Sequence, residues 1–331
     1  MDNMLVKERR GEIVENVVRG SVCVVGYDGE PIARTGDIDR TTYFRSALKP
    51  LQALLVLMSG MPQRRGFTRE ETAIMAASHA GEEIHLHCIL SMLKKAGYEE
   101  NDLIMNPEYP VAQKDHDDMA AHGIPPRKAL HNCSGNHIGI MLLSEHLNAS
   151  HKNYYLPDNP AQKEILRITS VMSEYREENI KTGTDGCGIP TLAVPLVNMA
   201  VSYLNLACPE RLMDECLADA ARLMAELMNE YPKMIRGTGY MCEVLNADRN
   251  IAAKSGSAGV YCLGLKKERI GLALKLEDGS HKYRAFIIAE ALRQLGYSNL
   301  ATIEKLDALS VKDIMNDTGD IVGRAETCFK L

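Results

Sequence analysis

The sequence predicts an α+β fold, in which a mainly antiparallel sheet is built from both chain termini and flanked by helices, with a central helical subdomain. Three observations support this prediction: a hairpin signal near the N-terminus, helical periodicity through the middle, and strand patterns that return towards the C-terminus. We expect a single domain over residues 1–331. Its sheet would come from about 12–45 and 235–331, and its mostly helical middle from about 46–234.

The N-terminal segment predicts a β-hairpin. Valines at positions 22, 24 and 25 lead into Asp28-Gly29, a dipeptide typical of two-residue hairpin turns, and a second strand is expected over Pro31–Thr35. Because a tight hairpin joins antiparallel strands, the chain opens on an antiparallel pair and not on a βαβ unit.

Residues 46–60, SALKPLQALLVLMSG, predict a helix because their apolar residues recur at 3.6-residue spacing. Pro50 is tolerated only in the first turn of a helix, where its missing N–H would have no partner. The helix therefore begins close to Ser46, which we expect at or near the N-cap. Backbone N–H groups at such a position favour developing negative charge.

The middle of the chain predicts helices joined by loops. Thr68-x-x-Glu71 matches a capping box ahead of an apolar run. Helices are expected over about 82–96, 136–147, 162–173 and 209–229, with a polar loop at 106–119 and a glycine-rich break at 181–191.

Strand signals return after residue 250. IAAKSGSAGVYCLGL predicts a turn and a strand, and ERIGLALKLEDG predicts a strand that ends at an Asp278-Gly279 turn. HKYRAFIIAEALRQLG then predicts a helix. Together with the N-terminal hairpin, these strands indicate one sheet built from both ends of the chain.

Composition and charge exclude several classes of protein. A net charge of −6 gives no positive field for nucleic acid or an anionic membrane. No run approaches the roughly 18 apolar residues of a membrane-spanning helix, and the N-terminus lacks an apolar signal segment. The nine cysteines are scattered and odd in number, unlike a secreted disulfide framework. We therefore expect a cytoplasmic protein with reduced thiols, without nucleic-acid or membrane partners.

Ser46 and Lys49 lie three residues apart, so on a helix they share a face, with side chains roughly 5–6 Å apart. A hydroxyl and an amine at this spacing can act as nucleophile and base, as in the Ser-x-x-Lys motif of penicillin-recognising enzymes, although a solvated helix turn has the same pattern. Lys254-Ser255-Gly256, at the head of the C-terminal strands, is similar to the Lys-Thr-Gly of serine acyl-transfer enzymes. The order of motifs and the architecture therefore agree.

Three other stretches are rich in reactive side chains. Ser78 ends an apolar helical run in SHAGEEIH, where the plain interpretation is a helix terminus. Cys133 and Cys187 lie in two separate glycine-containing loops, NCSGNH and TGTDGCG. Such a pair could hold a soft metal such as zinc, or the loops could simply turn tightly.

The blocks GDIDRTTYFRSALKPLQAL, SHAGEEIH, NCSGNHIGIM, GTDGCGIPT and KSGSAGVY together resemble the bacterial L-asparaginase II family, in the family's order and over nearly the whole chain. The resemblance implies an L-asparaginase with a serine β-lactamase-like fold, and a homodimer. By motif position it also implies two Ser–Lys pairs, Ser46 with Lys49 and Ser78 with Lys254. Arg45 and Asp185 fall where the family contacts its substrate.

The resemblance further implies a zinc ion held by Cys133, Cys187 and a lysine, but this chain carries Asn136 at the lysine position. An amide is a poor zinc ligand, so we expect either that His137 substitutes or that zinc is weakly held or absent. The chemistry itself would need no cofactor.

The implied activity is hydrolysis of the side-chain amide of L-asparagine to L-aspartate and ammonia by Ser-Lys acyl transfer. Two alternatives stay open: a serine amidohydrolase specific for glutamine or a β-lactam, and a non-catalytic amino-acid-binding relative. The sequence also leaves open which serine is acylated.

Overall fold

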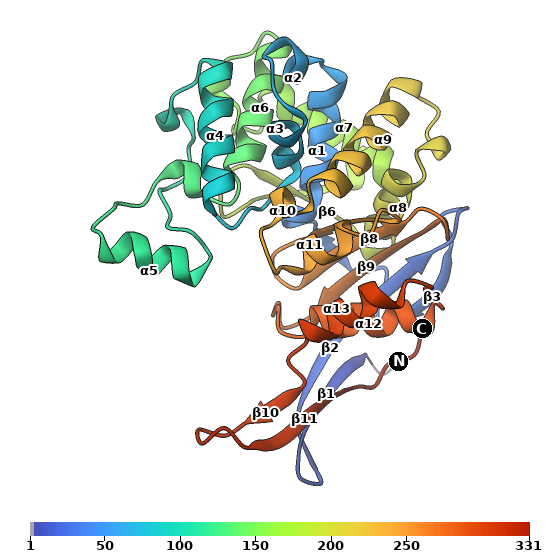
Figure 1. Cartoon of the computed structure of the whole chain (residues 1–331). Helices are drawn as coiled ribbons and strands as arrows, with labels where there is room; N and C mark the ends of the chain where they lie inside the picture. Colours follow the sequence, from blue (N-terminus) through green and yellow to red (C-terminus); the bar gives the residue numbers. More distant parts are fainter. Residues whose placement is uncertain (1–2) are drawn as a thin grey trace.

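The computed structural model describes residues 3–331 and confirms the predicted α+β class (Figure 1). A cluster of helices occupies one end of the molecule and a long antiparallel sheet the other, with both chain ends near each other beside the sheet. The residues that the sequence marks as reactive lie where the helices meet the end of the sheet, as the contacts below show.

Within residues 3–331, eight strands form the main sheet, and all its pairings are antiparallel. The order is β10-β11-β1-β2-β9-β8-β7, and β3 pairs with β2 beside this path. Both ends of the chain supply the strands: β1 (Met4–Arg10), β2 (Ile13–Val25), β3 (Pro31–Thr35), β7 (Ile251–Ser255), β8 (Val260–Leu265), β9 (Ile270–Leu276), β10 (Asp313–Met315) and β11 (Ile321–Thr327).

The helical part lies between these two groups of strands. Its α-helices are α1 (Lys49–Met58), α2 (Met61–Arg64), α3 (Arg69–Ala73), α4 (Glu83–Ala96), α5 (Gln113–Ala121), α6 (Ser134–His146), α7 (Pro160–Ser173), α8 (Leu196–Ala207), α9 (Glu215–Glu230), α10 (Pro232–Ile235) and α11 (Met241–Asn246). Two more helices, α12 (Arg284–Gln294) and α13 (Leu300–Ala308), lie beside the sheet near the C-terminus (Figure 1).

A second sheet was not predicted. The glycine-rich stretch at 181–191 begins a hairpin of β5 (Lys181–Thr184) and β6 (Pro190–Pro195), and β4 (Thr41–Tyr43) completes the order β4-β6-β5. These strands are too short for their alternation to stand out beside three glycines. Their turn carries Asp185 and Cys187 and points both residues towards the start of α1, as the contacts described below show.

Several local predictions are confirmed and others are corrected. Thr68 and Glu71 form the predicted capping box of α3. The second half of the polar stretch 106–119 belongs to α5, which has no buried residue and therefore no apolar stripe to reveal it. The strand β1 precedes the expected start of the sheet at residue 12, because its charged, partly exposed residues hide the alternation.

Ser46 lies near the N-cap of the helix, as expected, but does not occupy it. Ser46 lies within a single 3-10 turn, η1 (Arg45–Leu48), and the N-cap of α1 is Leu48. Pro50 does occupy the first turn of α1, as expected. The extra turn arises because Arg45 adopts a left-handed backbone (φ 52°), which redirects the chain one residue before Ser46.

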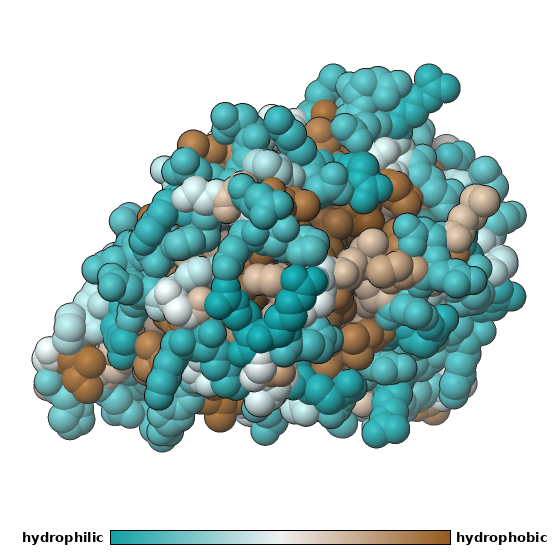
Figure 2. Space-filling view, turned by 90° about the horizontal axis from the view of Figure 1, so that it is seen from above, coloured by the Kyte–Doolittle hydropathy of each residue, from teal (hydrophilic) through white to brown (hydrophobic). Residues whose placement is uncertain are grey.

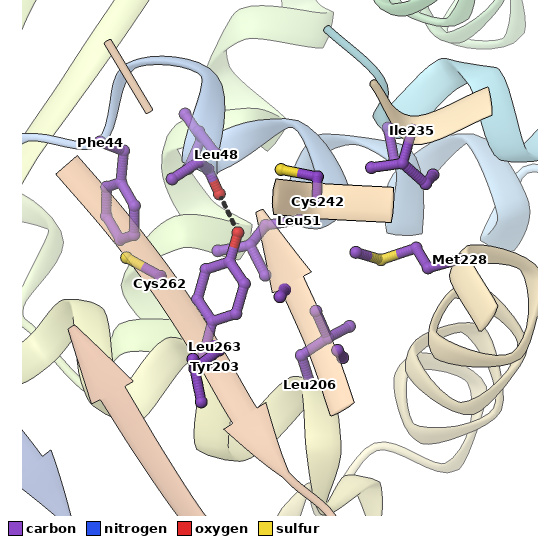
Figure 3. Packing of buried hydrophobic residues seen from close by; sticks show 14 of the residues in the cluster. Phe44, Leu48, Leu51, Tyr203, Leu206, Met228, Ile235, Cys242, Cys262 and Leu263 are labelled. Atoms are coloured by element: carbon purple, nitrogen blue, oxygen red, sulfur yellow. Dashed lines mark hydrogen bonds between the residues drawn. The ribbon is translucent and has the colours of Figure 1, made fainter. Parts of the chain in front are cut away.

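A buried core fixes the turn that carries Ser46 (Figure 3). Phe44, Leu48 and Leu51 from this turn and α1 pack with Tyr203 of α8 and with Leu263 of β8. The Tyr203 hydroxyl donates a hydrogen bond of 2.7 Å to the Ala47 carbonyl, so α8 holds the turn directly.

The helix α8 itself lies very close to the sheet, because β9 presents a glycine to it. A Cβ at Gly271 would lie 2.0 Å from the Ala200 carbonyl oxygen, a distance that no side chain tolerates. The glycine is thus needed for α8 to reach the depth at which Tyr203 supports the Ser46 turn.

The face of the molecule seen in Figure 2 is mostly hydrophilic, with small hydrophobic areas between the polar side chains. Within residues 3–331, none of the helices is both long enough and apolar enough to cross a membrane.

Candidate active site

One serine hydroxyl lies between two buried lysine amines. Ser78 Oγ accepts hydrogen bonds from Lys49 Nζ at 3.1 Å and from Lys254 Nζ at 2.9 Å. All three side chains are buried, with Lys254 at 0% exposure and Lys49 at 3%. The fold therefore brings together three of the four predicted catalytic residues. Of these, Ser78 and Lys254 are 176 residues apart in the sequence.

Each member of this cluster is fixed by a different element. Lys49 is the first residue of α1, and Lys254 is the fourth of the five residues of β7. Ser78 follows the short helical turn after α3, where its N–H donates to the Ile235 carbonyl and its own carbonyl accepts from Arg236 Nη1 at 2.6 Å. The residue after the lysine strand is also constrained: a Cβ at Gly256 would lie 2.6 Å from the Phe44 carbonyl oxygen.

The two lysines differ in their surroundings. Complete burial, together with the positive charges of Lys49 and Arg236, lowers the pKa of Lys254 to about 7, against the opposing charge of Cys242. Lys49, in contrast, donates to the Ala77 carbonyl at 2.8 Å and to Cys133 Sγ at 3.1 Å. With a pKa of about 7, Lys254 can take up a proton near neutral pH.

Ser46, the fourth predicted catalytic residue, is half-buried in the turn that precedes α1. Among residues 3–331 its hydroxyl has no hydrogen-bond partner, and the amine of Lys49 is directed to Ser78 instead. Arg45, immediately before it, has the left-handed backbone, a conformation that costs about 1–3 kcal/mol in a residue other than glycine. Such strain is common where a fold positions a reactive group.

Two cavities meet at Ser46. The larger has a volume of about 400 Å³ and is lined by Ser46 and Ser78 together with Ser257 and several arginines. The smaller, of about 10 Å³, has room for one water molecule and is lined by Ser46, Lys49 and the Asp185–Cys187 turn. A ligand bonded to Ser46 thus has a cavity on each of two sides.

Arg45 and Asp185, the predicted substrate contacts, lie at the smaller cavity and bind each other. Arg45 Nε and Nη2 donate to the two carboxylate oxygens of Asp185, at 2.7 and 3.1 Å. This bidentate ion pair leaves three guanidinium N–H donors and further carboxylate lone pairs unused. Both residues can therefore still contact a ligand.

Cys133 and Cys187 also come together, with a hydrogen bond between their thiols. That bond, with the charge of Lys49, holds the pKa of Cys133 well below its usual range, although burial opposes this. Cys187 is affected in the opposite sense, because its bond to Cys133 raises its pKa. Cys133 thus has the lower pKa of the two thiols, and its sulfur faces the Lys49 amine.

The residues around this pair do not fit a zinc ion. Within residues 3–331 no three His, Cys, Asp or Glu side chains converge as metal ligands would. Asn136 donates its amide to Gln52 Oε1 at 3.1 Å, and His137 is held through Nδ1 by the Tyr154 hydroxyl at 2.7 Å. Asn136 Oδ1 and His137 Nε2 are buried without hydrogen-bond partners within residues 3–331, but His137 does not converge with the two thiols as a third ligand.

Some cavity residues could not be found from the sequence. Arg236, His281 and Arg284 all line the larger cavity, yet they come from segments without a motif. Ser257 follows Lys254-Ser255-Gly256 and also reaches the cavity, so the Lys-x-Gly motif was the one signal that pointed close to it.

Comparison with protein families gives one match: the profile of the family described as L-asparaginase II aligns with residues 6–327. No curated protein matches the chain.

Similar solved structures include a β-lactamase from Mycobacterium bovis, with 12% identity and a TM-score of 0.45 over 83% of this chain and 94% of that chain. A Bacillus glutaminase has 15% identity and a TM-score of 0.40, over 85% and 92% of the two chains. The D-alanine carboxypeptidase AmpC from Burkholderia cenocepacia has 10% identity and a TM-score of 0.38, over 88% and 93%. At such low similarity, the chemistry of the site has to be derived from its own residues.

Proposed function

The chain belongs to the L-asparaginase II family, and on that premise we propose that it hydrolyses the side-chain amide of L-asparagine to L-aspartate and ammonia by Ser-Lys acyl transfer. The family indicates a hydrolase that acts on amides. The observation that carries the finer proposal is the contact of Ser78 Oγ with both lysine amines, beside a second serine at a cavity. A serine nucleophile that has no histidine as its base usually needs a neutral amine within reach of its hydroxyl.

Ser46 is the proposed nucleophile because it borders both cavities, so that a scissile amide can span it. Its Oγ attacks the amide carbon, and the carbonyl oxygen becomes an oxyanion. Ser46 and Ser257 both line the larger cavity, and their backbone N–H groups donate to no protein group within residues 3–331. They are the proposed oxyanion donors, a contribution commonly worth about 3–4 kcal/mol for each donor.

The proton of Ser46 is proposed to pass along the hydrogen-bonded series Lys49, Ser78 and Lys254. Lys254, with a pKa of about 7, accepts a proton from Ser78 Oγ. Ser78 Oγ in turn takes a proton from the Lys49 amine. Lys49 is then neutral and takes the proton of Ser46. The net transfer is from Ser46 to Lys254.

Collapse of the tetrahedral intermediate breaks the C–N bond. The proton held on Lys254 returns through Ser78 to the departing nitrogen, which leaves as ammonia. Water then attacks the acyl-Ser46 ester with the same lysines as base, and releases aspartate.

Arg45 and Asp185 are proposed to bind the amino-acid end of the substrate. Asp185 would accept from the α-ammonium and Arg45 would donate to the α-carboxylate, using the donors and lone pairs that their own ion pair leaves free. The smaller cavity holds only about one water molecule as it stands, so the β5–β6 turn has to move outward on binding.

We expect the rate to rise with pH through about 7. The base form of Lys254 is required, and its pKa of about 7 means that it is lost as the pH falls. Below that pKa, kcat/KM should drop about tenfold for each pH unit. Ammonia release from asparagine between pH 5 and 9 measures this, and a flat profile across pH 6–8 would exclude Lys254 as the base.

Zinc content provides an independent test of the cysteine pair. Because the described residues supply only two converging thiols, purified protein should contain well under one zinc per chain by elemental analysis. Dialysis against a chelator should leave asparagine hydrolysis unchanged. One tightly held zinc per chain would show that Asn136 or His137 completes a site.

Two alternative functions are separated from asparagine hydrolysis by the choice of substrate. A related specificity, for glutamine or a β-lactam, would use the same Ser–Lys contacts. A non-catalytic amino-acid-binding relative would need Arg45 and Asp185 but not two buried lysines on one hydroxyl. Release of ammonia from asparagine and glutamine, with hydrolysis of a chromogenic β-lactam, separates the three: we expect turnover of asparagine, and absence of any turnover would leave the binding protein.

Homodimerisation and a cytoplasmic location stay predictions from the sequence. Sedimentation velocity at micromolar concentration tests the first, and fractionation of the native cells tests the second.

A further inference from the structure

The cavity beside the two serines is far larger than the ammonia that asparagine releases. Its volume of about 400 Å³ lies in the range of sites for small organic ligands, about 300–1,000 Å³. Ammonia needs about the space of one water molecule, roughly 30 Å³. The size of this cavity is therefore unexplained by asparagine alone.

The cavity is also cationic, and no acidic residue of the described part of the chain lines it. Two of its four basic side chains are accounted for. Lys282 forms an ion pair with Glu8 at 2.9 Å, and the pKa of His281 is lowered by burial and by the nearby arginines, so this ring is neutral at pH 7.

The other two are Arg236 and Arg284, and neither has a carboxylate partner within residues 3–331. Arg236 donates Nη1 to the Ser78 carbonyl and lies over the Tyr240 ring at 4.8 Å. Arg284 donates Nη1 to the carbonyls of Gly256 and Val260, while its Nε is buried with no hydrogen-bond partner. Two guanidinium charges in one acid-free cavity are costly unless an anion joins them.

The proton path shows which part of the substrate faces this cavity. Ser78, which is proposed to return the proton to the departing nitrogen, lines the larger cavity and not the smaller one. The departing nitrogen must therefore point into the larger cavity. The amino-acid end of the substrate carries an ammonium group, which a carboxylate can bind. It therefore belongs on the other side of Ser46, where Asp185 supplies the only carboxylate at either cavity among the described residues.

We propose that the larger cavity is a leaving-group site, and that the preferred substrates are amides whose nitrogen carries a carboxylate-bearing group, bound by Arg236 and Arg284. A β-linked aspartyl dipeptide is the simplest member of this class, because its second residue places a carboxylate beyond the scissile nitrogen. Ser46 Oγ bonds to the side-chain carbonyl carbon and the C–N bond breaks. The nitrogen takes the proton returned through Ser78, and the second amino acid departs as a free amine. This inference rests on the proposed acyl transfer and extends it to a substrate class.

The test compares two substrates that differ only in the distal charge: β-aspartyl-alanine and its C-terminal amide. Release of alanine or alaninamide is measured by amine analysis, with ammonia release from asparagine followed in parallel. We expect kcat/KM for the acid to exceed that for the amide by about tenfold or more, as hydrogen bonds to a charged group give. In Arg236→Gln this ratio should fall to nearly one.

The ratio is informative because both substrates are measured on the same variant, so general damage from the lost Ser78 contact cancels. Lys282→Gln is the matched control: it also removes a cation from the cavity lining, but one already paired with Glu8, so the ratio should be kept. Arg284→Lys gives a second variant, which keeps the charge but loses the guanidinium geometry, and should lower the ratio in part.

Two outcomes would overturn the proposal while leaving asparagine hydrolysis in place. One is a wild-type ratio near one, or no cleavage of either dipeptide beside normal ammonia release. The other is an equal loss on asparagine and on β-aspartyl-alanine in Arg236→Gln, which would place the arginines at the acyl half. If no amide is hydrolysed at all, the proposed acyl transfer itself fails, and the leaving-group site fails with it.

Discussion

Ser46→Ala is expected to abolish the hydrolysis of asparagine, with kcat falling by about a thousandfold or more while the protein stays folded. Removal of a serine nucleophile deletes the covalent step and leaves only the binding and electrostatic contributions. Ser46 is half-buried and its hydroxyl bonds to no other group within residues 3–331, so its loss should change the free energy of unfolding very little.

The matched control lies at the far end of α1 from the turn that carries Ser46. Ser59, the C-cap of α1, donates its hydroxyl to the Val56 carbonyl at 2.6 Å. It is not among the residues that line either cavity. Ser59→Ala should therefore keep nearly full activity, even though it removes a bonded hydroxyl. More than a tenth of the wild-type rate in Ser46→Ala would rule out Ser46 as the nucleophile.

Lys254→Met should lower the rate by a similar factor, without destabilising the protein at pH 6. The amine at this position is the proposed final acceptor of the proton, so its removal should lower kcat by about a hundredfold to ten-thousandfold. The pKa of Lys254 is lowered from 10.5 to about 7 in the folded protein, so the buried amine destabilises the fold increasingly as the pH falls from 10.5 to about 7, and fully below that pH. The melting temperature of Lys254→Met should therefore equal or exceed that of the wild type at pH 6.

Lys275 offers a matched control for this variant. It is likewise a buried lysine on the main sheet, 9% exposed, and its amine donates only to the carbonyls of Ala258 and Leu276. Lys275→Met should retain most of the activity. Equal losses in the two variants would mean that the effect comes from damage to the sheet and not from a missing base.

The predicted fold class is confirmed because its signals are local. The Asp28-Gly29 hairpin, the capping box at Thr68 and the periodic helix α1 each depend on a few neighbouring residues. The sheet of β4, β5 and β6 escaped prediction because its pairing joins Thr41–Tyr43 to residues about 150 positions away. Nothing in either short segment marks the other as its partner.

The same distinction applies to the candidate site. The spacing of Ser46 and Lys49 predicts that they share a helix face, whereas the backbone turn at Arg45 places Ser46 before the helix and directs Lys49 to Ser78. Burial of Lys254, which sets its pKa, depends on how β7 packs under the helices and is not encoded by a tripeptide. The arginines of the larger cavity carry no motif at all.

Trapping of the acyl-enzyme tests the central claim most directly. Wild-type protein is mixed with asparagine, quenched with acid within the first turnover, digested, and examined by mass spectrometry. An aspartyl ester on the peptide that contains Ser46, absent from Ser46→Ala, is the result we predict. An ester on the peptide that contains Ser78, or a first turnover that releases ammonia without any adduct, would contradict it.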